Sequence, residues 1–397
     1  MNTSSGSSHL RVAQCITCPL TQHGGVEVLV RALIDGLQGE VELFLVSVDN
    51  LNSLGVWNDK LAGHFCWDSN NPSRTQIESL IRWALQNRID VLHFHLGYTY
   101  AWNTRSWTHC PITECRRAGI RCVSTNHGAF SLWDFVGPQR SWPFRLLALI
   151  LCWPAKLRQL AAVDWEATVS MHDFHAVRRW FFPLRSKFNQ IYHSVLDESI
   201  IPDLPKKNIV LCLGTVGSRK GQQHLAEAFG RIARRFPDWR LVIAGRHAPD
   251  GTPEAMFEAI KLHNIADQVD VLTDVSDKQA RILLAEAAVF GMPSLAEGLG
   301  LSLQEALYAR AACVGSRIGG IPDLIIDGKT GLLVPPADPH ALKESLVRVM
   351  EDSPLREAIA KAGRHHILER GMTKDGMTRA YLKLYQLADG SSFSPET

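Results

Sequence analysis

A stretch near residue 300 combines two carboxylates with a glycine-rich turn. Glu297 and Glu305 enclose seven residues. An apolar run before them and a helix predicted at Ser302–Ala309 make this a strand–turn–helix connection. Glu297 is expected on an exposed turn and Glu305 about one turn inside the helix. A carboxylate can accept hydrogen bonds from the vicinal hydroxyls of a sugar or a ribose, but a glutamate early in a helix can also merely offset the helix dipole.

The turn between the two carboxylates supplies backbone donors. The first N–H groups of a helix have no partner within it, so they suit the oxygens of a phosphate or a hydroxyl group. Glycine lets a ligand approach the backbone closely. The residues of this turn are Gly298, Leu299, Gly300 and Leu301. We therefore predict that the turn binds ligand oxygens.

A second glycine-containing loop, Gly214–Gly221, joins a predicted strand to a predicted helix. Its glycines and the helix start favour an anion, and Arg219 and Lys220 add two cations. The spacing is not that of the P-loop, G-x-x-x-x-G-K-[ST]. An ordinary strand–helix connection with two solvated cations explains the loop about equally well.

The elements that must position these loops follow one scheme in both halves of the chain. In the first half, the apolar run Leu10–Ile16, a turn at His23-Gly24-Gly25 and a helix-like stretch Val26–Leu37 give the opening of a βαβ unit. Further elements are predicted at Val41–Val48, Arg74–Gln86, Val91–His95 and Arg121–Thr125. Short apolar runs that alternate with helices indicate parallel strands covered on both faces.

The second half restarts the scheme after Asp197–Asn208, whose two prolines and Lys-Lys pair are typical of a linker. Its predicted elements are Asn208–Leu213, Gln222–Arg235, Arg240–Ala244, Val269–Leu272, Ala288–Met292, Ser302–Ala309 and Ala312–Ser316. We predict an α/β fold of two doubly wound, Rossmann-like domains facing across a cleft at the carboxyl ends of both sheets. The predicted parts are 1–196, a linker at 197–207, 208–372, and a C-terminal helix and flexible tail at 373–397 that pack back on the first domain.

Composition narrows the class of protein. The length of 397 residues suits two domains, and 46% hydrophobic and 21% charged residues are typical of a soluble globular chain. A net charge of +2 argues against a nucleic-acid-binding protein, and no stretch reaches the ~20 apolar residues that cross a bilayer. The polar first residues do not resemble a secretory signal, so we expect a cytoplasmic protein. Nine scattered cysteines predict neither a disulfide framework nor a metal site.

Together these segments resemble the retaining GT-B glycosyltransferases of family four, whose Glu-x7-Glu signature Glu297 and Glu305 match. The Pro-Ser before this signature, and the Gly-Gly-Ile-Pro-Asp and Asp-Gly-Lys-Thr-Gly-Leu-Leu-Val after it, fall in the family's order. The resemblance also includes Gly214–Gly221, Gly24-Gly25, Asp90-Val-Leu-His-Phe-His95 and Asn126-His127-Gly128. It is most specific from Asn208 to Pro336 and looser between Ala129 and Asp203.

The resemblance implies retaining transfer of a hexose from a nucleotide-diphosphate sugar, without a metal or a further cofactor. Glu305 would bind the ribose hydroxyls and Glu297 the transferred sugar. Lys220 would contact the diphosphate, and His127 would approach the sugar from the other domain. The other implied donor-binding residues are Gly24, Gly25, Thr215, Arg219, Gly298, Leu299, Gly300 and Leu301. Thr215 stands where many relatives have an arginine, a charge that Arg219 can supply.

Other functions fit these residues less well. A nucleotide-sugar epimerase of the same two-domain fold is the open alternative, because it shares the fold and the diphosphate site and lacks only an acceptor site. The spacing of Glu297 and Glu305 favours transfer. A nicotinamide-dependent oxidoreductase is disfavoured, because neither half has G-x-G-x-x-G after its first strand. The chain also has no Asp-x-Asp, the metal-holding pair of the other large transferase fold.

The stretch 130–182 is rich in tryptophan and basic residues. From Gly128 to Gln190, eight Lys and Arg stand against four Asp and Glu, around an apolar run at Leu146–Trp153. Such a composition suits a peripheral contact with an anionic membrane at its inner face, which would fit a lipid-linked saccharide acceptor. The favoured alternative is a helix pair buried under the first sheet, since apolar runs of this length are more often core.

Overall fold

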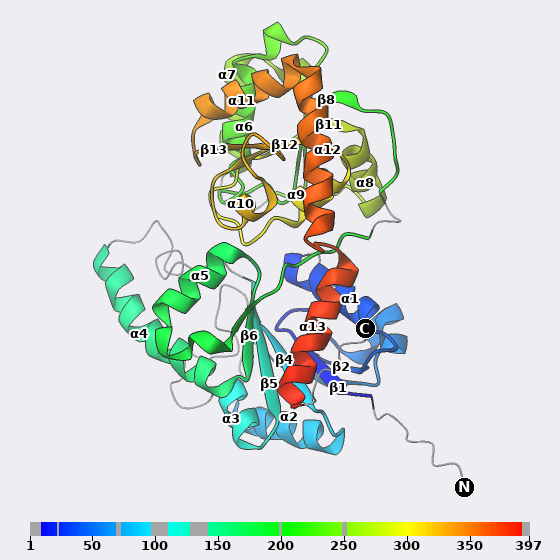
Figure 1. Cartoon of the computed structure of the whole chain (residues 1–397), viewed down its shortest axis with the longest axis vertical. Helices are drawn as coiled ribbons and strands as arrows, with labels where there is room; N and C mark the ends of the chain where they lie inside the picture. The colour runs from blue at the N-terminus through cyan, green and yellow to red at the C-terminus, as the bar shows by residue number, and fades with distance from the viewer. Residues whose placement is uncertain are drawn as a thin grey trace. The chain divides into compact units, whose positions relative to one another are not determined.

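The computed structural model describes residues 9–21, 24–68, 73–96, 110–127, 142–197, 201–247 and 252–390 (Figure 1). The chain folds as two compact units. The first unit comprises 1–195 together with 374–397, and the second comprises 196–373. Each unit has its own parallel sheet and its own hydrophobic core.

Seven parallel strands form the sheet of the first unit, in the order β3-β2-β1-β4-β5-β6-β7. The strand order changes direction between β1 and β4, and ligands of such sheets bind beyond the carboxyl ends of the strands at this switch point. The strands are β1 (Arg11–Cys15), β2 (Glu42–Ser47), β3 (Gly63–Cys66), β4 (Val91–Leu96), β5 (Arg121–Asn126), β6 (Trp165–Thr168) and β7 (Phe188–Gln190).

The C-terminal helix α13 (Lys374–Asp389), red in Figure 1, packs on the first unit although it follows the second in sequence. Tyr381 and Tyr385 are fully buried there. Close contact with α1 is possible because Gly36 has no side chain: a Cβ on it would lie 2.2 Å from the Thr378 hydroxyl. The other helices of this unit are α1 (Gly25–Gly36), α2 (Arg74–Gln86), α3 (Pro111–Arg117), α4 (Trp142–Ala162) and α5 (Met171–Trp180).

Six parallel strands form the sheet of the second unit, in the order β10-β9-β8-β11-β12-β13. Here the switch point lies between β8 and β11. The strands are β8 (Lys207–Leu213), β9 (Arg240–Ala244), β10 (Val269–Leu272), β11 (Ala287–Met292), β12 (Ala312–Ser316) and β13 (Leu332–Val334). The helices are α6 (Gln222–Gly230), α7 (Thr252–His263), α8 (Asp277–Glu286), α9 (Leu301–Tyr308), α10 (Ile321–Leu324), α11 (Pro339–Glu351) and α12 (Ser353–Glu369).

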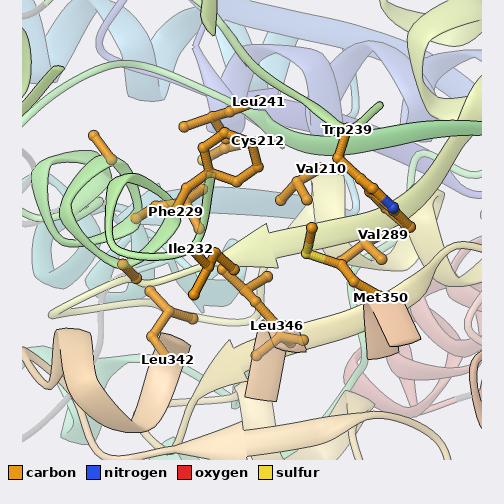
Figure 2. Packing of buried hydrophobic residues seen from close by; sticks show 14 of the residues in the cluster. Val210, Cys212, Phe229, Ile232, Trp239, Leu241, Val289, Leu342, Leu346 and Met350 are labelled. Atoms are coloured by element: carbon orange, nitrogen blue, oxygen red, sulfur yellow. The ribbon is translucent and has the colours of Figure 1, made fainter. Parts of the chain in front are cut away.

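The core of the second unit lies between its sheet and helices α6, α7 and α11 (Figure 2). Val210 and Val289 come from the two strands at the switch point, Phe229 from α6 and Leu346 from α11, and all four are fully buried. Burying each such side chain stabilises the fold by about 1.5–3 kcal/mol. This packing fixes the strand ends, and so it fixes where the loops beyond them begin.

The predicted α/β fold of two doubly wound sheets is confirmed, and the predicted Arg74–Gln86, Arg240–Ala244, Val269–Leu272 and Ala312–Ser316 have the observed bounds. The helix predicted at Gln222–Arg235 is too long, because α6 ends at Gly230. A Cβ at Gly230 would lie 2.6 Å from the side chain of His263 on α7, so close packing of the two helices requires glycine there.

Candidate functional site

The two glycine-containing loops singled out from the sequence follow β8 and β11, the neighbouring strands at the switch point of the second sheet. The strands are parallel, so both loops leave the same edge of the sheet. Leu295 N–H donates to the carbonyl of Arg219 over 2.7 Å. The structure therefore brings loop 214–221 and loop 293–300 into direct contact.

Gly221 is the tightest point between these loops. Its φ is +66°, a backbone conformation that L side chains rarely adopt. A Cβ there would lie 2.2 Å from the carbonyl oxygen of Pro293. The glycine that ends the first loop is thus needed both for its own conformation and for the second loop's approach.

Gln222 holds loop 214–221 in shape, a role that the sequence did not reveal. Its side-chain Nε2 donates to the carbonyl of Thr215 over 3.0 Å, and its Oε1 accepts from Gly217 N–H over 3.4 Å. The backbone of Val216 also bonds to the carbonyl of Arg246 over 2.8 Å. Thr215 and Arg219 are exposed on this loop, and a helix-start glutamine gives no signal of such a role in one sequence.

Lys220 and Glu297 form an ion pair between the two loops. The Lys220 Nζ lies 2.5 Å from Glu297 Oε2, and the Ser294 hydroxyl donates to the same oxygen over 3.4 Å. Their side chains are 24% and 11% exposed. A half-buried pair is screened less by water than a surface pair, so the cation is held firmly in place.

The expectation that Glu297 lies on an exposed turn is wrong, because the residue is only 8% exposed. The loop after β12 covers it. Gly319 in that loop has φ +54°, and a Cβ there would lie 1.8 Å from the Glu297 carbonyl oxygen. The glycine of the Gly-Gly-Ile-Pro-Asp segment is thus what permits this close approach.

Replacing Gly319 with alanine should therefore destabilise the second unit and weaken any ligand bound at Glu297. Gly328 is a matched control, since its φ is +73° but a Cβ on it would meet nothing within 4 Å. Gly328→Ala should cost only the backbone strain of about 1–2 kcal/mol, and Gly319→Ala about 2 kcal/mol more. Thermal unfolding of both variants measures the difference, and equal shifts in Tm would contradict the close approach.

The Gly-Leu-Gly turn leads into α9 with Gly300 as its N-cap, at φ +99°. Leu299 points into the protein and is 4% exposed. The first N–H groups of α9 lie at the carboxyl edge of the sheet and carry the positive end of the helix dipole. Gly298, Leu299, Gly300 and Leu301 thus form a start of helix beside the Lys220–Glu297 pair.

Glu305 lies within α9, one turn after its start. Burial raises the pKa of its carboxyl to about 7, Arg281 on α8 opposes this shift and Asp277 adds to it. Glu305 is half-buried, whereas a glutamate that only offsets a helix dipole is ordinarily exposed at the surface. The carboxylate therefore has an energetic cost in the free protein, which a ligand that donates hydrogen bonds to it would relieve.

A pocket that the sequence did not reveal lies at the end of β10. It has a volume of about 340 Å³ and is lined by Leu272, Thr273, Asp274, Val275, Gln279, Ile282 and Leu283. The last three come from α8, the helix that also carries Arg281 beside Glu305. Its apolar lining with a few polar groups is typical of a small-molecule site.

In the first unit, Gly24 and Gly25 begin α1 directly after the β1 loop. The carboxylate of Glu27 folds back over Gly24, where a Cβ would lie 2.2 Å from it. This helix start is thus already next to a negative charge. His23, which precedes the two glycines, lies outside the described residues.

His127 is the first residue after β5, and its N–H extends the ladder by bonding to the carbonyl of Leu96 over 2.9 Å. The side chain is half-buried. Its Nε2 lies 2.9 Å from Nδ1 of His95. Burial lowers the pKa of His127 to about 3, so the ring is neutral at physiological pH. Gly128 lies outside the described residues.

No three His, Cys, Asp or Glu side chains within the described ranges are grouped so that they could hold a metal ion. His93 and His95, which alternate on β4, are buried and bonded to protein groups on both ring nitrogens. They are core histidines.

Both units match families of known proteins. The model described as Glycosyltransferase Family 4 matches residues 23–194, and the model described as Glycosyl transferases group 1 matches residues 198–366. An alpha-D-kanosaminyltransferase of Streptomyces kanamyceticus is 30% identical over 159 residues, 40% of each chain. A GDP-mannose-dependent alpha-(1-6)-phosphatidylinositol monomannoside mannosyltransferase of Mycolicibacterium smegmatis is 30% identical over 173 residues, 42% of this chain and 44% of its own.

The alignments thus span less than half the length of these curated relatives. The fold extends further: sucrose-phosphate synthase from Thermosynechococcus elongatus superposes with a TM-score of 0.74 at 17% identity, over 97% of this chain and all of the other. A glycosyltransferase from Rickettsia africae superposes with a TM-score of 0.72 at 16% identity, over 97% of this chain and all of the other. With both units matched by family models and the fold shared along its length, the chain belongs to the family-four glycosyltransferases of the GT-B fold.

Proposed function

We propose that this protein transfers a hexose from a nucleotide-diphosphate sugar to a saccharide or a lipid-linked saccharide, with retention of the anomeric configuration. The observation that carries the proposal is the Lys220–Glu297 pair, set beside the start of α9 at the switch point of the second sheet. A cation and a row of N–H groups suit a diphosphate. A carboxylate held at the same place suits sugar hydroxyls.

The second unit would bind the donor. Lys220 is proposed to contact the diphosphate, together with the exposed Thr215 and Arg219 of the same loop. The backbone of the turn 298–301 would hold sugar and phosphate oxygens, and Glu305 the ribose hydroxyls. The pocket lined by Leu272–Val275 and α8 would take the base, because a flat apolar ring fits its lining.

Transfer of the sugar leaves a diphosphate with growing negative charge. Stabilising that charge with Lys220 and fixed backbone dipoles is the main catalytic requirement. In the proposed mechanism, the sugar–phosphate bond breaks, the acceptor oxygen forms its bond on the same face, and the leaving phosphate takes the acceptor's proton. A neutral His127, with its pKa lowered to about 3, is a poor base, which agrees with this assignment.

A lipid-linked acceptor is supported by the surface of α4, α5 and the turn after α5. Large apolar side chains are exposed there: Leu146, Trp153, Trp180 and Phe182. The Trp153 ring stacks on Phe181 at 6.2 Å, so α4 and the turn are adjacent. Arg178 and Arg179 add positive charge. Residues 128–141, part of the stretch singled out from the sequence, lie outside the described residues.

We propose that this surface rests on an anionic membrane. No helix in the described part of the chain is long and apolar enough to cross one. The mannosyltransferase of Mycolicibacterium smegmatis named above acts, by its name, on a phosphatidylinositol monomannoside. An acceptor with a lipid anchor would bring this chain to the same kind of surface.

Vesicle binding tests the membrane contact. Phe182→Ser should weaken binding to phosphatidylserine-containing vesicles about tenfold, because 63% of the Phe182 side chain is exposed and available for insertion. Phe257→Ser, at an aromatic residue 46% exposed on α7, is the matched control and should bind as the wild type does. If both variants and the wild type sediment equally with anionic and neutral vesicles, the contact is wrong.

The activity itself is tested with a donor panel. Release of nucleoside diphosphate from UDP-, GDP-, ADP- and dTDP-sugars would be followed with and without saccharide acceptors. A transferase releases nucleoside diphosphate faster when an acceptor is present, whereas an epimerase changes the configuration of the sugar without net release of nucleoside diphosphate. Binding of no donor in the panel would refute the proposal.

A further inference from the structure

A buried chain of polar side chains runs beneath His127 in the first unit. Its members come from β1, β4, β5, the segment after β7, and α13, which are far apart in sequence. They are Gln14, His93, His95, Thr125, His193, Tyr381 and Tyr385, and each is no more than 4% exposed. Burying so many polar groups destabilises the fold unless each of them is hydrogen-bonded.

Gln14 sets the direction of the hydrogen bonds. Its Oε1 lies 2.8 Å from Nε2 of His95, and its Nε2 donates to the hydroxyl of Tyr385 over 3.0 Å. An amide oxygen can only accept, so His95 carries its proton on Nε2. A neutral His95 then has a lone pair on Nδ1, and His127 Nε2, 2.9 Å away, must be the donor.

The remaining hydrogen bonds among these polar side chains run in the same direction. The Tyr385 hydroxyl accepts from Gln14, and Nδ1 of His93, 2.7 Å away, is the acceptor for its own proton. His93 Nε2–H then donates to the Thr125 hydroxyl over 2.7 Å.

The Thr125 hydroxyl in turn donates to the hydroxyl of Tyr381 over 2.8 Å, and the Tyr381 hydroxyl donates to Nε2 of His193 over 2.7 Å. Every donor points the same way, from His127 to His193. A single arrangement of protons thus satisfies every hydrogen bond described among these side chains.

All four histidines are neutral in this arrangement. Burial lowers the pKa of His93, His95 and His193 well below the usual value, and each lies near another histidine, which lowers the pKa further. A neutral imidazole has one donor and one acceptor, so the proton on one nitrogen decides what the other can do.

We propose that His95, oriented by Gln14 and Tyr385, is a positioning residue that holds His127 in its Nε2–H tautomer and presents the Nδ1 lone pair to a hydroxyl of the sugar substrate. The inference rests on the proposed function in one respect, namely that His127 contacts the sugar. Within the described residues, Nδ1 of His127 has no hydrogen-bond partner. His127 would thus accept a hydrogen bond from the substrate and would not donate one.

The tautomer can be read directly by ¹⁵N NMR of histidine-labelled protein without any substrate, with His127→Asn identifying the signal. We expect Nδ1 of His127 to be unprotonated and Nε2 protonated. Tyr385→Phe removes the acceptor for Gln14 Nε2 and should give a mixture of tautomers. Tyr381→Phe is the matched control, since it makes the same change on the same helix but leaves the bonds of Gln14 and His95 intact.

Kinetics give the second readout. His95→Leu removes the acceptor for His127 and should lower kcat about tenfold, the loss expected for one well-placed hydrogen bond, with little change in KM. His95→Asn places an amide oxygen where Nδ1 was and should recover activity to within about threefold. Loss of the same size in both variants would indicate packing alone.

These outcomes separate the inference from the proposed function. A protonated Nδ1 in the wild type, or the same tautomer in Tyr385→Phe and Tyr381→Phe, overturns the positioning role whatever the enzyme does. If the tautomer is as expected but His127→Asn transfers sugar at the full rate, the positioning is correct and the contact of His127 with the sugar is wrong.

Discussion

Replacing Lys220 with alanine should lower kcat for sugar transfer about a thousandfold while weakening donor binding far less. The reason is that the leaving diphosphate gains negative charge as its bond to the sugar breaks, and a fixed donor or cation at that place stabilises the transition state more than the ground state. Lys220 is fixed by its 2.5 Å contact with Glu297. Single-turnover rates with the donor found in the panel measure the effect.

Arg219→Ala is the matched control, because Arg219 is the adjacent cation and is exposed on the same loop. Its loss should slow transfer by no more than about tenfold, since an exposed charge is screened by water. Equal losses in the two variants would show that the loop needs only positive charge. An unchanged kcat in Lys220→Ala would rule out its catalytic role.

Stability must be separated from catalysis in this experiment. Lys220→Ala leaves the carboxylate of Glu297, 11% exposed, without its cation, and should destabilise the second unit by about 2 kcal/mol. The double variant Lys220→Ala, Glu297→Gln removes the unpaired charge and should recover most of the lost Tm. It should not recover transfer, so activity that returned with Tm would mean that the lysine acts only through folding.

The sequence predicted this site because its loops follow the strands of a parallel sheet. Alternating apolar runs and helices indicated which strands exist, and parallel strands bring their carboxyl ends to one edge. Glu297 and Lys220 are 77 residues apart in the sequence, yet each follows a strand of the same parallel sheet. That the two residues touch could not be predicted, because it depends on Gly221 and Gly319, whose close contacts are with backbone far along the chain.

One strand of the first sheet could not be predicted from the sequence, because it contains a charged residue. β6, Trp165–Thr168, carries Glu166, which is fully buried beside Lys156 at 2.6 Å. The Ser124 hydroxyl donates to the same carboxylate over 2.9 Å. In sequence a glutamate argues against a buried strand, and only the fold shows the lysine from α4 that compensates it. The buried chain of polar side chains beneath His127 could not be predicted either, since its hydrogen-bond partners come from five separate segments of the sequence.

Glu305→Gln should stabilise the free protein at alkaline pH, the opposite of what a helix-dipole role would give. Burial raises the pKa of Glu305 to about 7 from 4.5. The folded state thus holds this proton more tightly than the unfolded state, so its stabilising effect is complete below about pH 4.5 and is lost as pH rises through about 7. At pH 8.5 the variant should be more stable by about 2 kcal/mol, and near pH 5 the difference should vanish.

Glu258→Gln, at an exposed carboxyl on α7, should leave Tm unchanged at both pH values. Thermal unfolding of the three proteins between pH 5 and 8.5 checks the prediction. If Glu305→Gln were instead less stable at pH 8.5, Glu305 would be offsetting the dipole of α9 as an ordinary surface residue does.

The same carboxyl should make donor binding depend on pH. The ionised form accepts charge-assisted hydrogen bonds from both ribose hydroxyls, which are stronger than those of the protonated carboxyl. Binding of the intact nucleotide sugar should therefore weaken as pH falls below about 7 and should release a proton there. A nucleotide sugar is the suitable probe because its phosphates do not titrate in this range. Glu305→Gln should bind about thirtyfold more weakly at pH 8, the loss of one or two charge-assisted hydrogen bonds.

In Glu305→Gln the affinity should be nearly constant between pH 5.5 and 8, since the group that titrates has gone. Calorimetry in buffers of different ionisation enthalpy would detect the proton released by the wild type and its absence in the variant. Gain of stability together with loss of donor affinity would show that the carboxyl of Glu305 serves ligand binding and lowers the stability of the free protein. A variant with wild-type affinity at pH 8 would remove Glu305 from the donor site.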